Sequence, residues 1–121
     1  MEDIRQGLEF TFIRETDPPK DITEMLIDGE SVEACYKTLR DFTLVTNYRF
    51  IFGDKQGITG KKVELYTIPF KSIVMYSSEN AKGMFDMGEI QVWTRLGTFK
   101  LNLKKGVNVR KLDKLIASHI L

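Results

Sequence analysis

Residues 27–73 read IDGESVEACYKTLRDFTLVTNYRFIFGDKQGITGKKVELYTIPFKSI. This stretch decides the fold, because it holds several runs of β-branched and aromatic residues, the types enriched in strands. The runs are separated by Arg40-Asp41, by Thr46-Asn47 and by residues 53–60. Asparagine tolerates the left-handed backbone of a tight turn, so Thr46-Asn47 predicts a hairpin. The stretch therefore predicts consecutive antiparallel strands with short connections.

The strand pattern continues beyond this stretch. Apolar and polar residues alternate over 90–95 and over 99–104, and Leu96-Gly97 lies between them as a hairpin turn. Together with the run Ile73 to Tyr76, these segments bring the total to about seven strands. We expect an antiparallel meander whose long connections are residues 53–60 and 80–88.

The C-terminal segment changes to a helical period. Asn108 can cap the first turn of a helix. The apolar stripe that follows consists of Leu112, Leu115, Ile116, His119 and Ile120. Their spacing is that of one helix face, which needs an apolar surface to cover it. The open end of a curled sheet supplies such a surface. We therefore expect a mainly β fold with α: a partly open antiparallel barrel closed by this amphipathic helix.

A short helix is also predicted before the first of these strands. Asp21 and Glu24 have the spacing of a capping box, and Gly29 is the expected C-terminal stop.

The first 19 residues fit two patterns. Ile4, Leu8 and Phe12 recur every four residues, as on a helix, whereas the aromatic and β-branched residues 10–13 suit a strand. Pro18-Pro19 ends whichever element forms. We expect residues 1–20 to be a segment that docks on a neighbouring subunit, and residues 21–121 to form a single domain.

Composition excludes several classes of protein. The chain has 121 residues, 42% of them hydrophobic, and a formal net charge of +1, so no global field favours nucleic acid. The single cysteine, Cys35, cannot form an intramolecular disulfide and is expected as a small core residue. No apolar run is long enough for a transmembrane helix, and Met1-Glu2-Asp3 lacks the basic start of a signal peptide. These features predict a cytoplasmic protein.

We expect no catalytic, metal or cofactor site. Residues 53–62 superficially match a phosphate-binding loop, but Ile58 replaces a required glycine and Lys62 replaces the magnesium-binding hydroxyl. His119 and Cys35 alone cannot hold zinc on one chain. The carboxylates are scattered, with no pair placed for acid–base chemistry. The protein is therefore predicted not to be an enzyme.

Four segments give the chain a family resemblance: Asp28–Ser31 (DGES), Leu44–Ile51 (LVTNYRFI), Gly57–Glu64 (GITGKKVE) and Ile68–Ile73 (IPFKSI). In this order and spacing, the chain resembles the bacterial pleckstrin-homology (PH) domain family. The resemblance leaves the first 20 or so residues uncovered. It implies a PH-like barrel and a protein that forms homo-oligomers, with rings built by strand contacts between subunits.

The first function hypothesis is therefore a non-enzymatic PH-like module that self-associates, with a further protein partner left open. Aromatic residues are enriched at interfaces, and the strand runs carry outward-capable Tyr36, Tyr48, Tyr66, Tyr76 and Trp93. The expected interface residues are Phe10, Phe12, Met84, Phe85 and Met87.

The alternative hypothesis is a ligand-binding module for an anionic lipid headgroup or an extended peptide. Its candidate anion-binding residues are Lys61, Lys62, Lys104 and Lys105. The same lysines are also expected simply to protect strand edges from aggregation. The tight connection at residues 37–41 carries Asp41, so no phosphoinositide pocket is expected there.

Overall fold

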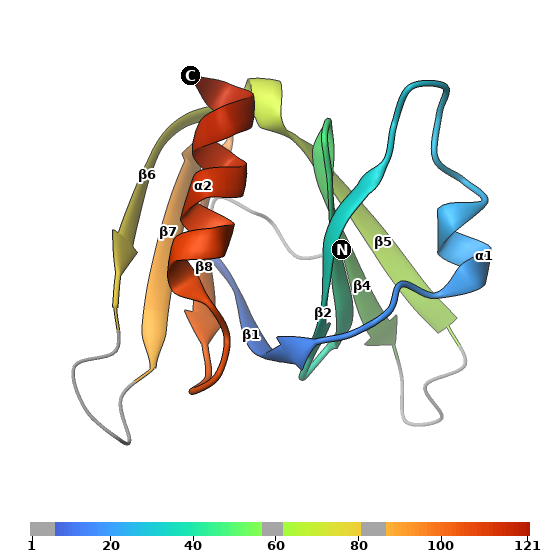
Figure 1. Ribbon diagram of the computed structural model, residues 1–121, viewed down its shortest axis with the longest axis horizontal. Helices are drawn as coiled ribbons and strands as arrows, with labels where there is room; N and C mark the ends of the chain where they lie inside the picture. The colour runs from blue at the N-terminus through green and yellow to red at the C-terminus, as the bar shows by residue number, and fades with distance from the viewer. Residues whose placement is uncertain (1–6, 57–61, 81–86) are drawn as a thin grey trace.

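The computed structural model describes residues 7–56, 62–80 and 87–121 (Figure 1). Its elements in chain order are β1 (Leu8–Glu15), α1 (Lys20–Thr23), β2 (Val32–Thr38), β3 (Asp41–Thr46), β4 (Arg49–Gln56), β5 (Lys62–Pro69), η2 (Phe70–Ser72), β6 (Ile73–Glu79), β7 (Gly88–Thr94), β8 (Gly97–Leu103) and α2 (Val109–Ile120).

The eight strands in the described residues belong to one sheet, in the order β5-β4-β3-β2-β1-β8-β7-β6. The sheet is not closed, because β5 and β6 lie at its two ends. Figure 1 shows two arms, one of β6, β7 and β8 and the other of β2 to β5, with β1 passing between them. The predicted mainly β fold with a closing C-terminal helix is confirmed.

One strand and one pairing differ from the expected antiparallel meander of about seven strands. Segment 8–15 forms β1, which runs antiparallel to β2 but parallel to β8, with Leu8 opposite Phe99 and Phe12 opposite Leu103. Side chains alternate between buried and more exposed from Leu8 to Ile13. Residues four apart lie on the same face of a strand, where side chains alternate with a period of two, and also on the same face of a helix. The spacing of Leu8 and Phe12 therefore did not distinguish a strand from a helix.

Both predicted hairpins are confirmed. Asn47 and Tyr48 join β3 to β4, so Thr46 is the last residue of β3; residues 95–96 join β7 to β8, and Gly97 begins β8. The hydroxyl of Thr46 accepts hydrogen bonds from the backbone N–H groups of Tyr48 and Arg49 at 3.0 Å, which fixes the first turn. In the second turn, the Thr94 hydroxyl donates to the carbonyl of Gly97 at 2.9 Å.

The C-terminal helix is confirmed with its cap. The side-chain oxygen of Asn108 accepts the backbone N–H of Lys111 at 3.0 Å. Leu112 and Ile116 are fully buried, whereas Leu115 and Ile120 pack partly buried against the same core. The helix contacts β6, β7 and η2, so it covers one arm of the sheet and reaches the segment that connects β5 to β6 (Figure 1).

The prediction for the short N-terminal helix was wrong in its boundaries and caps. Helix α1 spans only Lys20–Thr23, its N-cap residue is Pro19, and no side chain caps it. Asp21 lies inside the helix, because the preceding prolines fix extended backbone up to residue 19. Gly29 has a φ of +81° in a later turn and does not end the helix.

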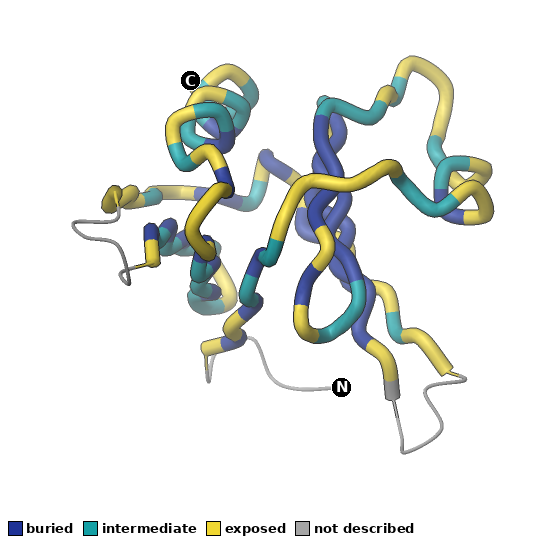
Figure 2. The backbone as a smooth tube through the Cα atoms, turned by 60° about the horizontal axis from the view of Figure 1, so that its bottom comes forward, coloured by how far each residue is buried: buried dark blue, intermediate teal, exposed yellow. Residues whose placement is uncertain are grey.

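The core lies between the two arms. Phe10 stacks on Phe52 with ring centroids 4.1 Å apart, and Phe99 meets Phe52 edge-on at 5.4 Å. Figure 2 shows the contrast between buried strands in the middle of the sheet and exposed segments at its rim. In β3, five of six residues are buried, whereas in β6 only Ile73 is.

A second, smaller core lies under α1. It consists of Ile22, Cys35, Phe42, Leu44 and Ile51. The prediction that Cys35 is a core residue is confirmed, since 3% of it is exposed. Burial raises the pKa of its thiol to about 11.

Candidate functional site

The two terminal strands of the sheet carry exposed apolar side chains. On β5, Val63 is 42% and Leu65 is 37% exposed; on β6, Val74 is 62% and Met75 is 53% exposed. An edge strand also presents N–H and C=O groups that no strand on its outer side pairs. Each edge therefore combines backbone hydrogen-bonding groups with apolar area, which is the combination that strand addition uses.

These edges carry little charge. The described part of β5 has Lys62 near its start and Glu64, and β6 has only Glu79 at its end. Pro69 and an irregular register between Ile73 and Met75 lie at the ends of the two strands that adjoin η2. Features that normally discourage edge pairing thus lie toward the ends of each strand and leave the middle of each edge uncharged.

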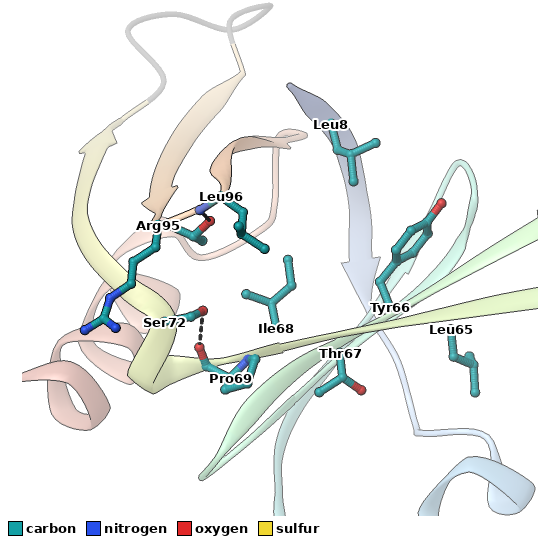
Figure 3. Close-up of a pocket in the computed structure, with 10 residues that line it drawn as sticks. Leu8, Leu65, Tyr66, Thr67, Ile68, Pro69, Ser72, Arg95 and Leu96 are labelled. Carbon is teal, nitrogen blue, oxygen red and sulfur yellow. Dashed lines mark hydrogen bonds between the residues drawn. The ribbon is translucent and has the colours of Figure 1, made fainter. Parts of the chain in front are cut away.

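A groove opens along the β5 edge, and we call it the edge groove: Leu8, residues 65–69, Ser72 and residues 94–96. Its volume is about 320 Å³. Figure 3 shows Ile68 from β5 and Leu96 from the β7–β8 turn extending toward the same space, with Leu8 of β1 above them. The lining is mostly apolar, so the groove suits an apolar side chain better than an ion.

Helix α2 fixes the β6 edge from inside the molecule. The Tyr76 hydroxyl donates to Asp113 Oδ1 at 3.0 Å, and Ser78 donates to the other oxygen of the same carboxylate. Partial burial and the neighbouring Asp113 raise the pKa of Tyr76. These contacts hold β6 in position while leaving Val74 and Met75 exposed.

The family-like segments meet at the end of the molecule where β3 turns into β4. Arg49 donates from Nε to Glu30 Oε2 at 2.8 Å and from Nη2 to Glu30 Oε1 at 3.0 Å, while Thr46 donates to the same carboxylate at 2.7 Å. Arg49 also donates to the hydroxyl of Thr67. The Arg49 hydrogen bonds, opposed by burial, lower the pKa of Glu30 to about 2. The network ties the loop before β2 to β4 and β5.

A second, larger groove of about 630 Å³ lies beside this network, lined by residues 27–28, 47–49, 69–71 and His119. Two of the side chains that line it are held by contacts within the chain, whereas Asp28 and Lys71 are exposed. Arg49 is held by Glu30, and His119 contacts Glu33 Oε1 at 2.5 Å while stacking on Phe70. His119 was predicted as a packed residue of the helix stripe, and its side chain is 18% exposed. The contacts of Arg49 and His119 therefore hold this end of the molecule together.

The predicted interface residues differ in how far they are exposed. Phe10 and Phe12 are 1% and 0% exposed in the core of their own chain, so they offer no area to a neighbour. Met87 is 48% exposed just before β7. Met84 and Phe85 lie outside the described residues. Of the outward-capable aromatics, Tyr36 and Tyr66 are buried and Tyr48 is exposed, while Tyr76 and Trp93 are half-buried.

The predicted anion-binding lysines lie on separate parts of the sheet. Lys62 begins β5, whereas Lys104 and Lys105 follow β8, and four strands lie between β5 and β8 in the sheet order. All three are exposed, and Lys61 lies outside the described residues. No single strand edge therefore presents the set.

Two features of the site were not predicted from the sequence. The Glu30–Arg49 pair joins two quoted segments, but their charges alone did not reveal the contact. The exposure of Val74 and Met75 follows from the terminal position of β6. One signal was available: residues 74–79 lack the alternation that a half-buried strand shows.

Within the described ranges, no three His, Cys, Asp or Glu side chains gather as metal ligands. Nor does any described helix have the length and apolar character needed to cross a membrane.

The fold and its open edges define a PH-like domain, and comparison with known proteins places it in a family. The sequence matches the bacterial PH domain family over residues 8–120. The chain therefore belongs to this family, as the four segments implied.

Similar proteins include the uncharacterized protein YjqA of Bacillus subtilis, 39% identical over 103 residues that cover 82% of each chain. Among solved structures, a protein with a pleckstrin-homology domain from Shewanella loihica is 30% identical, with a TM-score of 0.80 over 95% of this chain and 100% of that one. A pleckstrin-homology domain from Shewanella amazonensis is 35% identical, with a TM-score of 0.67 over 84% and 83% of the two chains.

Proposed function

We propose that the protein is a non-enzymatic interaction module that assembles with copies of itself through the two edges of its sheet. One observation carries the proposal: the open sheet ends in β5 and β6, and both strands expose apolar side chains with little charge. Proteins that stay monomeric usually protect such edges with lysines, bulges or a covering segment. Contact with another copy would cover them.

The contact we propose joins unlike edges, β5 of one copy to β6 of the next. A contact between two different surfaces leaves one surface of each kind unused at the ends of a chain of subunits. Such an assembly either closes into a ring or grows into a filament. In a closed ring, every β5 edge would pair with the β6 edge of a neighbouring copy. Such a ring agrees with the homo-oligomer that the family resemblance implied.

The test places a charge on each edge separately. Leu65→Lys alters β5 and Met75→Lys alters β6, and both residues are already exposed, so neither change should disturb folding. Leu39→Lys is the matched control, because Leu39 is 68% exposed in the β2–β3 turn. Size-exclusion chromatography with light scattering should give the monomer mass of 14.0 kDa for each edge variant and the assembled mass for the control.

Mixing the two edge variants distinguishes a contact between unlike edges from a contact between like edges. Each variant retains one unaltered edge, so a contact between β5 and β6 should let the mixture form a dimer that neither variant forms alone. A contact between like edges would instead leave each variant able to dimerise by itself. Edge variants that keep the full assembled mass would refute the proposed surfaces.

The structure offers less support for the alternative, an anion-binding module, than for self-assembly. Lys62 begins β5, the Lys104–Lys105 pair follows β8, and these two strands are not neighbours in the sheet. If anionic vesicles bound the wild-type protein, and charge reversal at Lys104 and Lys105 abolished that binding, this alternative would gain the support that it now lacks.

A further inference from the structure

The larger groove, of about 630 Å³, lies where four distant segments of the chain meet. Residues 27–28 precede β2, residues 47–49 form the β3–β4 turn and the start of β4, and residues 69–71 run from the end of β5 into η2. His119 adds the fourth wall from the last turn of α2, at the end of the molecule where Figure 1 shows α2 beside η2. The volume is within the range of about 300–1,000 Å³ that is typical of sites for small ligands.

Hydrogen bonds and ring contacts within the chain fix these walls. The Asn47 side chain donates to the carbonyl of Gly29 at 3.0 Å and accepts the backbone N–H of Ser31 at 2.8 Å. The backbone N–H of Phe70 donates to the carbonyl of Tyr48 at 3.0 Å. The groove is therefore built by the fold itself, as most sites for small ligands are.

Several side chains in the lining are not used to hold the fold. Asp28 and Lys71 are exposed, and within the described residues their side chains form no hydrogen bond and no ion pair. Ile27 and Tyr48 add apolar area, since they are 61% and 44% exposed. A complementary ligand carries a cation for Asp28, an anion for Lys71 and an apolar group for Ile27 and Tyr48.

The separation of the two charges decides the class of ligand. Asp28 precedes β2 and Lys71 follows β5, and β3 and β4 lie between these strands in the sheet. Neighbouring strands are about 4.8 Å apart, so the two segments are about 14 Å apart along the sheet. A free amino acid carries both charges on one carbon atom and is too short for this span. Three extended peptide residues place opposite charges about 10 Å apart, and the side chains of Asp28 and Lys71 supply the remaining reach.

We propose that this groove binds a short peptide with free ends. Its ammonium group pairs with Asp28, its carboxylate pairs with Lys71, and its central apolar side chain lies against Ile27 and Tyr48. The site does not include Leu65 or Met75, the residues that test the proposed self-assembly. Peptide binding is therefore a second activity, which can be measured whether or not copies of the chain assemble.

Isothermal titration calorimetry with the tripeptide Ala-Phe-Ala tests the proposal. The N-acetylated peptide lacks the cation, and the C-amidated peptide lacks the anion. The unblocked peptide should bind saturably, with one site per chain. Each blocked form should bind about three- to fivefold more weakly, as expected for the loss of one exposed ion pair.

Two variants assign each end of the peptide to a residue. Asp28→Asn should weaken binding of the unblocked and C-amidated peptides by the same factor and leave binding of the N-acetylated peptide unchanged. Lys71→Gln should do the reverse. Both residues are exposed, so neither change should disturb folding. Lys104→Gln is the matched control, because Lys104 is an exposed lysine that follows β8, outside the groove, and its loss should leave binding unchanged.

Three results would overturn the proposal. They are the absence of saturable binding at millimolar peptide, blocked peptides that bind as tightly as the unblocked one, and free phenylalanine that binds as tightly as the tripeptide. Its failure is distinct from a failure of self-assembly. A monomer that shows the crossed pattern of peptide and variant effects keeps the site without the assembly, and an assembly that binds no peptide keeps the assembly without the site.

Discussion

The Glu30–Arg49 pair should stabilise the fold through the charge of Glu30, and the lowered pKa of Glu30 gives the order of magnitude. The Glu30 side chain is 0% exposed and Arg49 is 17% exposed, so solvent screens the pair only weakly. The pKa of Glu30 is about 2, against an ordinary value of 4.5. Each pKa unit corresponds to about 1.4 kcal/mol, so ionised Glu30 contributes about 3 kcal/mol to the free energy of unfolding at pH 7.

The sign of the pH dependence follows from the lower pKa in the folded state. The contribution is fully present above the unfolded pKa, falls to about half near pH 3, and is lost as the pH drops through about 2. Glu30→Gln should therefore reduce the free energy of unfolding by about 3 kcal/mol at pH 7 and by much less near pH 3.

Urea unfolding followed by circular dichroism measures both values. Glu24→Gln is the control, because Glu24 is exposed at the end of α1 and its substitution should change stability little at either pH. A Glu30→Gln variant as stable as the wild type at pH 7 would refute the reasoning. So would a loss of stability that stays constant on acidification.

Three further predictions concern the core and the last helix. Gly53→Ala should lower the free energy of unfolding by about 1–3 kcal/mol, because the added Cβ would lie 2.3 Å from the ring of Phe42. The same change should cost less in a Phe42→Leu background, where the ring is absent. Urea titration of the wild type, the two single variants and the double variant measures both costs. Cys35 should react with a chromogenic disulfide reagent at pH 8 only in urea, since burial and a pKa of about 11 keep its thiol protonated and inaccessible in the folded protein; fast reaction without urea would contradict this. Asn108→Ala should remove the cap of α2 and lower the free energy of unfolding by about 1 kcal/mol, whereas Asn108→Asp should retain most of it, as thermal melts can show.

The parts of the fold that depend on local pattern were predictable. Alternation over 90–95 and 99–104 gave the β7–β8 hairpin, and the stripe from Leu112 to Ile120 gave α2. Both signals lie within short stretches of sequence, where side-chain period directly reflects backbone geometry.

Pairing between distant segments was not predictable in this way. Strand β1 pairs in parallel with β8, which follows it only after most of the chain has passed. No turn connects the two strands, so no local signal fixes their register. For the same reason, Phe10 and Phe12 were assigned to a neighbouring subunit, although the core between the two arms buries them.

The candidate site depends on the same distant relationships. Sequence identified Leu65 and Met75 as members of strand-like runs, but only the sheet order shows that their strands lie at its two ends. The edge groove combines β1, β5 and the β7–β8 turn, three segments that are separate in the chain. Composition could therefore suggest an interaction module without locating its surface.

The solution mass of the wild-type protein tests the central claim most directly. Light scattering coupled to size-exclusion chromatography, repeated over a hundredfold dilution, would measure it. Self-assembly through the sheet edges predicts a mass several times 14.0 kDa that is stable on dilution. A mass of 14.0 kDa at every concentration would contradict the claim and leave the exposed edges to a different partner.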